Sequence, residues 1–201
     1  MQTPVSSKSD STLSHLLTAV LYTIVTVIVL GLIYPLVVTG IGMLVFPDQA
    51  NGSFVESNGN VVGSAIIGQL WTKPQYFQGR PSAAGKNGYD PTSTGGTNLG
   101  PTSKKLIEAT TSTIGALEKA NPQAAGEPPM DLVTSSASGI DPDISPEGAA
   151  WQIPRVVAAR HMTPAAVKAI VDAHTSGRIF GILGEPHVNV LLLNRALDAA
   201  R

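Results

Sequence analysis

The sequence predicts one membrane-spanning helix near the N-terminus, followed by a single water-soluble domain of the α/β or α+β class with a mixed sheet. Residues 16–46 carry no charged side chain and are rich in Leu, Val and Ile, and about 20 such residues suffice to span a bilayer as a helix. Residues 47–201 match the size of one ordinary domain. Their helix and strand signals lack the regular alternation of βαβ units, which favours a domain that mixes both elements.

These observations divide the chain into a disordered tail at residues 1–14, a transmembrane anchor at residues 15–46 and a soluble domain at residues 47–201. The tail is rich in Ser and Thr and shows no apolar periodicity. A cleaved signal peptide is the alternative explanation of the apolar run. Its hydrophobic region would have about 7 to 15 residues behind a basic start, whereas this run is far longer and follows a single basic residue, Lys8.

Glycine and proline set the expected limits of the anchor helix. Its clean part is expected at residues 16–38, with a kink at Pro35 because proline lacks an amide donor. The Gly-rich end is expected to leave the hydrocarbon. Gly31, Gly40 and Gly42 are candidates for close packing against a neighbouring helix, since small residues let two helices approach each other.

The charges on either side of the anchor predict its orientation. Lys8 and the α-amino group precede it, whereas Asp48 and Glu56 follow it, and the next basic residue is Lys73. Positive charge is enriched on the cytoplasmic side of membrane proteins. The N-terminus is therefore expected in the cytoplasm and the domain outside.

Apolar patterns and turn residues place the elements of the soluble domain. Strands are expected at residues 61–70, 131–135 and 188–193. Helices are expected at residues 102–120, 145–160, 163–177 and 194–201, and Pro154 is expected to divide the second of them. Residues 75–101 form an unusually long stretch of Gly, Pro, Ser, Thr and Asn, and loops beyond about 12 to 15 residues are usually functional or disordered.

Composition excludes several classes of function. The formal net charge is −1, which argues against binding to nucleic acid. The absence of cysteine excludes disulfides, thiolate nucleophiles and Cys-ligated zinc. His161, His174 and His187 lack the spacing of a metal motif, and no G-x-S-x-G elbow is present. The sequence therefore predicts no metal site and no catalytic residues.

Two Gly-rich segments bear comparison with phosphate-binding loops. Residues 79–86 have five residues between the glycines instead of four, and Asn87 stands where a P-loop has Ser or Thr. A turn-rich surface loop is the better interpretation. Residues 94–101 could form a nest of backbone N–H groups that binds an anion. Tight turns are favoured there, because no charged residues cluster beside the glycines.

A series of short motifs runs in order from the anchor to the C-terminus. It includes GS at 63–64, IGQ at 67–69, YFQGRPSA at 76–83, GGTNLGP at 95–101, DLVT at 131–134, SGIDP at 138–142, ISP at 144–146, QIPRV at 152–156, VNVL at 188–191 and LN at 193–194. In this order the motifs resemble the KdpC family, the small subunits of the Kdp potassium-transporting P-type ATPases of bacteria and archaea. The N-terminal tail is not covered by the resemblance.

The resemblance implies an accessory subunit of a high-affinity ATP-driven potassium uptake pump in the bacterial or archaeal plasma membrane. The implied partners are a potassium-selecting channel-like subunit, a P-type ATPase subunit that hydrolyses ATP, and a very small hydrophobic subunit, all in the lipid bilayer. The family is described as a catalytic chaperone that raises the ATP affinity of the hydrolysing subunit. ATP is thus the implied nucleotide, no cofactor is expected to be tightly bound, and potassium is handled by a partner.

Two sets of candidate site residues follow. The resemblance implies nucleotide or partner contacts at Gly95, Gly96, Thr97, Asn98, Gln152 and Arg155. A loop with aromatic residues and an arginine suits a protein interface, and its candidates are Tyr76, Phe77, Arg80 and Ser82. The predicted external location conflicts with direct ATP contact, because ATP is cytoplasmic. A membrane-anchored extracytoplasmic enzyme and a free nucleotide-binding regulator remain the alternatives.

Overall fold

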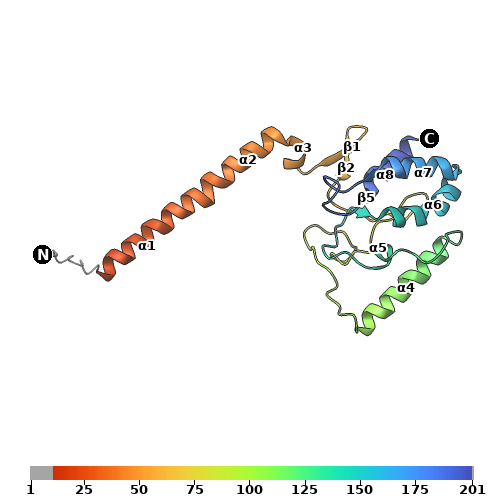
Figure 1. Cartoon of the computed structure of the whole chain (residues 1–201), viewed down its shortest axis with the longest axis horizontal. Helices are drawn as coiled ribbons and strands as arrows, with labels where there is room; N and C mark the ends of the chain where they lie inside the picture. The colour runs from red at the N-terminus through yellow and green to blue at the C-terminus, as the bar shows by residue number, and fades with distance from the viewer. Residues whose placement is uncertain (1–10, 201) are drawn as a thin grey trace. The chain divides into compact units, whose positions relative to one another are not determined.

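The computed structural model describes residues 11–200, which fall into two compact units, one ending at Gly52 and one beginning at Ser53 (Figure 1). The first unit is one long helix made of α1 (Thr12–Thr26), the π-helical segment η1 (Val27–Ile33) and α2 (Tyr34–Val45), followed by the short helix α3 (Pro47–Ala50). Residues Thr12–Val45 are long and apolar enough to cross a membrane. The prediction of one apolar N-terminal helix is therefore confirmed.

The limits of this helix differ from those predicted. It starts at Thr12, inside the predicted disordered tail, because the Ser11 hydroxyl caps it by accepting a hydrogen bond from the Ser14 N–H. The rest of that predicted tail, residues 1–10, lies outside the described residues. The helix also continues through Gly40 and Gly42 to Val45, beyond the predicted clean end at residue 38.

A π-helical bulge occupies the position where a kink was predicted. The N–H of Tyr34, the residue before Pro35, donates to the Val29 carbonyl, five residues back instead of four. In a regular α-helix the Pro35 ring would clash with the carbonyl four residues earlier. The wider π-helical turn shifts the carbonyls relative to the Pro35 ring, and π-bulges are themselves a usual cause of helix bends.

The second unit is an α+β domain with two small antiparallel sheets. Strands β1 (Phe54–Ser57) and β2 (Asn60–Ser64) form a hairpin whose turn residues Asn58 and Gly59 both have positive φ, as a two-residue hairpin turn requires. Strands β3 (Asp143–Ile144), β4 (Thr175–Ser176) and β5 (His187–Asn189) form a second sheet in the order β3-β5-β4. The predicted mixture of helices and strands is confirmed, whereas the predicted mixed sheet is not found among the described residues, because each strand pair is antiparallel.

The helices of this unit are α4 (Lys104–Ala120), α5 (Met130–Val133), α6 (Pro146–Arg160), α7 (Pro164–Ala173) and α8 (Val190–Ala199). Helix α7 packs against both α6 and α8. The buried core lies mainly among these three helices and β5, with one residue from the irregular segment before α4. Its members are Phe77, Leu132, Ile144, Ala149, Trp151, Val156, Val167, Val171, Val188, Val190, Leu193 and Leu197.

Several predicted elements are wrong in type or extent. Residues 131–135, predicted as a strand, overlap the one-turn helix α5. The predicted strand at 188–193 ends at Asn189, because the Asn189 side chain accepts the Leu192 N–H and starts α8 four residues before the predicted helix. The predicted strand at 61–70 is β2 alone. It ends at Ser64, because the Ser64 hydroxyl accepts the Ile66 N–H and the Ser64 carbonyl accepts the Ile67 N–H in a turn.

The two helices predicted from Ser-Pro and Thr-Pro signals have the predicted starts. Ser145 caps α6 through the Gly148 N–H, and Thr163 caps α7 through the Ala166 N–H. Pro154 does not divide α6, since core contacts of Trp151 and Val156 hold the helix on both sides of it. Helix α7 ends at Ala173, earlier than predicted, and leaves residues 175–176 to β4.

Candidate functional site

Residues 70–101 contain no helix or strand, yet side chains of α6 and α8 fix part of this segment in place. Asn194 of α8 accepts the Phe77 N–H with Oδ1 at 2.8 Å and donates from Nδ2 to the Phe77 carbonyl at 2.9 Å. Both residues are fully buried. One side-chain amide thus satisfies both backbone groups of Phe77, as a neighbouring strand would.

Gln152 of α6 repeats this arrangement on the next residue. Its Oε1 accepts the Gln78 N–H at 2.8 Å, and its Nε2 donates to the Gln78 carbonyl at 3.0 Å. The same Nε2 also donates to the Gly148 carbonyl, and Oε1 accepts a second bond from Arg155. Gln152 is only 1% exposed, so its amide is buried and its hydrogen-bonding groups are all engaged.

Two arginines of α6 hold the start of the same segment. Arg155 donates to the Pro74 carbonyl at 2.7 Å, and Arg160 donates to the Gln75 carbonyl at 2.7 Å. Arg160 also pairs with Asp198 of α8 at 2.7 Å and lies over the Tyr76 ring, 5.1 Å from its centroid. Residues 74–78, hereafter the clamped segment, are therefore bonded to α6 and α8 at every step.

Arg155 is a buried cation whose hydrogen-bond acceptors are neutral. These acceptors are the Pro74 carbonyl and the Gln152 amide oxygen. Burial lowers the pKa of the Arg155 guanidinium to about 10 from its ordinary value of 12.5. The side chain is thus still charged at neutral pH, and its charge is stabilised by polar groups of the clamp.

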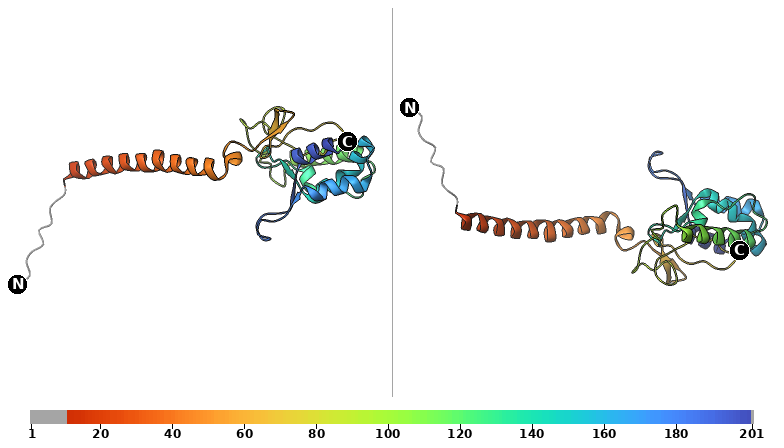
Figure 2. Two further views of the ribbon diagram at one scale, coloured as in Figure 1. Left: turned by 90° about the horizontal axis from the view of Figure 1, so that it is seen from above. Right: turned by 90° about the horizontal axis from the view of Figure 1, so that it is seen from below.

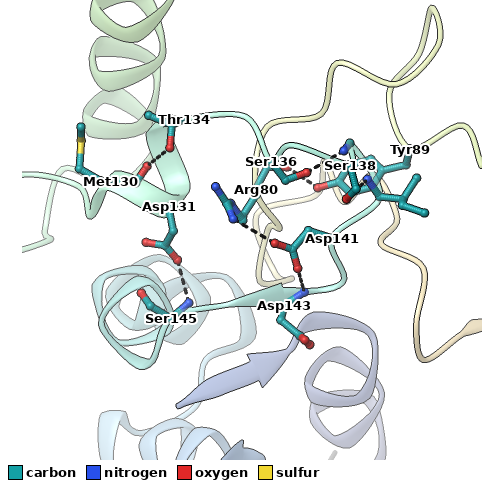
Figure 3. Close-up of polar contacts among 12 residues, drawn as sticks. Arg80, Tyr89, Met130, Asp131, Thr134, Ser136, Ser138, Asp141, Asp143 and Ser145 are labelled. Atoms are coloured by element: carbon teal, nitrogen blue, oxygen red, sulfur yellow. Dashed lines mark hydrogen bonds and ion pairs between the residues drawn. The ribbon is translucent and has the colours of Figure 1, made fainter. Parts of the chain in front are cut away.

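A second cluster joins residues 80–89 to residues 131–145 (Figure 3). Arg80 forms an ion pair with Asp141 at 3.0 Å, and Asp141 also accepts the Asp143 N–H at 3.0 Å. Asp131 reaches across to accept the Ser145 N–H at 2.7 Å, which helps to fix the start of α6. Each of these carboxylates thus anchors a neighbouring backbone or side chain.

Ser82 and Tyr89 close this cluster from the loop side. Ser82 Oγ donates to the Gly139 carbonyl at 2.6 Å and accepts the Tyr89 N–H at 2.7 Å. The Tyr89 hydroxyl donates to the Arg80 carbonyl. Burial, together with the nearby Asp141 carboxylate, raises the pKa of Tyr89 to about 12. The phenol therefore keeps its proton and acts as a donor at neutral pH.

Acidic side chains gather around a cavity of about 400 Å³ between this cluster and β5. The cavity is lined by Arg80, Asp131, Asp141, Asp143, Ile144, Ser145, Glu185, Pro186 and His187. Burial raises the pKa of Asp143, and the His187 and Asn189 side chains act in the opposite direction. Asp143 accepts a hydrogen bond from Asn189 at 3.0 Å. Three of the acids, Asp131, Asp141 and Asp143, are therefore engaged in holding the fold.

A second cavity of about 400 Å³ lies between the loop and α4. Its wall includes Trp71, Arg80, Tyr89, Thr113 and Leu117. The Nε1 of Trp71 and the Nε of Arg80 are buried and have no acceptor among the described residues. Trp71 and Arg80, which carry these two donors, are both residues of this cavity wall.

The predicted site residues do not form one group. Gly95 donates to the Ser138 carbonyl at 2.9 Å, and a Cβ on Gly96 would lie 3.1 Å from the Ala137 carbonyl oxygen. Thr97 and Asn98 are exposed. The Gly-rich stretch therefore contacts the turn at 137–138, whereas Gln152 and Arg155 contact the clamped segment.

Of the predicted interface loop, Phe77 is a core residue with no exposed surface, because its backbone and ring are both buried under α6 and α8. Tyr76, Arg80 and Ser82 are partly exposed. Sequence reasoning missed Asn194, Arg160, Tyr89 and Asp141. Asn194 and Asp141 belong to the quoted motifs, but no local pattern indicates which backbone groups they bind.

Comparison with known proteins identifies the family. A family model described as "KdpC: K+-transporting ATPase, c chain" matches residues 16–199. A potassium-transporting ATPase KdpC subunit of Koribacter versatilis is 49% identical over 188 residues, which cover 93% of this chain and 95% of the relative. The Myxococcus xanthus subunit is 54% identical over 186 residues, covering 92% and 88%. The subunit of Acidobacterium capsulatum is 50% identical over 186 residues, covering 92% and 98%. The resemblance seen in the ordered motifs is thus confirmed over nearly the whole chain, and this protein belongs to the KdpC family of potassium-transporting ATPase subunits.

Proposed function

We propose that this chain is a non-catalytic accessory subunit, needed for assembly and activity of the potassium pump, whose partner subunits hydrolyse ATP and select potassium. The observation that carries this proposal is the clamped segment with its neighbouring Arg80 cluster. Four side chains from α6 and α8 hold backbone that has no regular structure of its own. A preformed surface loses less conformational entropy on binding than a mobile one, which suits a structural contact between subunits.

The anchor is proposed to cross the membrane with the N-terminus in the cytoplasm and the domain outside. Its support is the charge distribution, with Lys8 before the helix and Asp48 and Glu56 after it. Gly31, Gly40 and Gly42 of the long helix support packing against a partner helix, since small residues let two helices approach closely.

The direct nucleotide role implied for Gln152 and Arg155 is less well supported than a structural one. Both groups are buried, and their hydrogen bonds hold the clamped segment. A nucleotide contact would have to break these bonds first, with an unfavourable loss of about 1–3 kcal/mol for each buried group left unpaired. Any effect of this subunit on ATP affinity is therefore proposed to pass through the assembled complex.

Purification from cells that express the pump with and without this chain tests the function. We expect a stoichiometric complex and potassium-stimulated ATP hydrolysis only when the chain is present. Turnover of a substrate by the purified chain alone would instead support an anchored enzyme. Saturable ATP binding by the chain alone would support a nucleotide-binding regulator.

Side-specific labelling tests the orientation, since the chain has no native cysteine. Ser112→Cys, at an exposed position of α4, should react with an impermeant maleimide in intact cells, and Thr12→Cys, at an exposed position of α1, should react only after the membrane is opened. The reverse pattern would place the domain in the cytoplasm. Ser82 is unsuitable as a probe because its hydroxyl holds the loop cluster.

A further inference from the structure

The segment between β4 and β5 presents an exposed apolar tip. Residues 179–184 contain four large apolar side chains and no charged one, and Phe180 is 90% exposed, the highest value among the large apolar residues described. Ile179, Ile182 and Leu183 are each more than half exposed. Residues 179–184, hereafter the tip, thus form an apolar surface that the rest of the described domain leaves exposed to water.

Local bonds hold the tip in this exposed position. Ile179 and Leu183 exchange backbone hydrogen bonds at 2.9 and 3.0 Å, and Gly181 donates to the Arg178 carbonyl at 3.0 Å. Arg178 and Glu185 form an ion pair at the base of the hairpin. Figure 2 shows the segment standing away from the helices of the domain. A collapsed loop would bury its apolar residues, whereas this hairpin projects them outward.

The tip lies at the end of the domain where the chain enters it. Asn189 of β5 donates to the Ala65 carbonyl, just after β2, at 2.8 Å. In Figure 2 the hairpin that contains the tip and the β1–β2 hairpin project from opposite sides of this part of the domain. Phe54 and Val61 of the β1–β2 hairpin, and Ile66 just after it, are exposed apolar side chains as well.

We propose that the tip inserts into the lipid leaflet that faces the domain. This inference rests on the membrane anchoring proposed above. Only residues 46–52 separate the apolar helix from the domain, and a chain of that length extends at most about 25 Å at 3.3–3.6 Å per residue. The bilayer is therefore always within reach of the entry end.

The chemistry of the tip favours lipid over a protein partner. Protein interfaces usually combine a core enriched in aromatic residues, Met and Arg with a polar rim, whereas this tip has one aromatic residue, three aliphatic residues, two glycines and no polar side chain. The ion pair of Arg178 and Glu185 at its base suits the headgroup layer once the apolar end is in the acyl region.

The test uses the full-length chain in vesicles of phosphatidylethanolamine and phosphatidylglycerol, with single cysteines carrying a polarity-sensitive fluorophore. We expect Phe180→Cys to show a blue-shifted emission and at least twofold quenching by spin-labelled lipids. Ser112→Cys on α4 should stay solvent-exposed, and Val29→Cys in the long helix should be quenched. Quenching at Val29→Cys without quenching at Phe180→Cys would overturn this inference while leaving the anchoring intact.

A second pair of variants separates insertion from an effect of the fluorophore itself. Adding Ile179→Asp and Ile182→Asp to the Phe180→Cys chain should abolish the shift and the quenching. Ile107→Asp on α4, another exposed apolar position, should leave both unchanged. Shielding of Phe180→Cys that appears only when the partner subunits are present, without lipid quenching, would assign the tip to a protein interface and contradict lipid insertion.

Discussion

Two irregular segments of the domain, the clamped segment at 74–78 and the tip at 179–184, are held in opposite ways. The clamped segment makes its bonds to distant helices, through Asn194, Gln152, Arg155 and Arg160. The tip makes its bonds within itself and presents its apolar side chains to the outside. Backbone without secondary structure can therefore be part of the core, whereas a well-bonded hairpin can leave its apolar side chains uncovered by its own domain.

The largest expected effect comes from removing the amide that holds Phe77. Asn194→Leu leaves a buried N–H and a buried carbonyl without partners, and at about 1–3 kcal/mol for each group we expect a loss of about 3 kcal/mol in unfolding free energy. Denaturant unfolding followed by tryptophan fluorescence measures it, since Trp71 and Trp151 both lie in this domain. Asn87→Leu, at an exposed position without a positive φ, is the matched control. Equal stability of the two variants would show that the clamp contributes nothing.

A smaller effect is expected for the phenol that joins Tyr89 to Arg80. Tyr89→Phe keeps the ring but removes the donor to the Arg80 carbonyl, and one such hydrogen bond is worth about 1 kcal/mol. Because burial keeps this phenol protonated to a pKa of about 12, the difference from wild type should be constant between pH 6 and 9. A difference that varies across this range would contradict the assignment of Tyr89 as a neutral donor.

Replacing the buried carboxyl of Asp143 is expected to give a smaller, pH-dependent gain in stability. Burial raises its pKa above the ordinary 3.8, so the folded protein binds its proton more readily than the unfolded chain and is destabilised by ionisation. Asp143→Asn should therefore raise the thermal midpoint at pH 7. The gain should shrink as the pH falls toward the ordinary pKa, where wild type is protonated. A gain that grows on acidification would mean that the carboxylate is stabilised in the fold.

The smallest effect on stability is expected at the tip. Phe180→Ser removes a side chain that makes almost no contact within the domain, so the unfolding free energy should change by less than about 0.5 kcal/mol. Tryptophan-monitored unfolding in detergent checks this value. A small change for Phe180→Ser beside a large loss for Asn194→Leu would establish that the clamped segment stabilises the fold and the tip does not. A loss as large as that of Asn194→Leu would place the tip in the core of the fold.

Some features follow from the sequence because they depend only on neighbouring residues. The long apolar helix follows from the absence of charge between His15 and Asp48. The starts of α6 and α7 follow from Ser145-Pro146 and Thr163-Pro164, since a cap bonds to an amide three residues away. The family likewise follows from short motifs in order. A cap predicted at Thr102, together with apolar periodicity, placed α4 within two residues of its start.

The tertiary structure decided the features that join distant residues. The bonds of Asn194 to Phe77 and of Gln152 to Gln78 span 117 and 74 positions. No local pattern indicates these partners, so Gln152 was predicted as a nucleotide or partner contact and Phe77 as an interface residue. The apolar run at 188–193 was predicted as a strand for the same reason. Its division at Asn189 depends on a side chain that caps a helix and binds Ala65 and Asp143 at once. Propensity acts over a few residues, whereas burial and hydrogen-bond pairing depend on the whole fold.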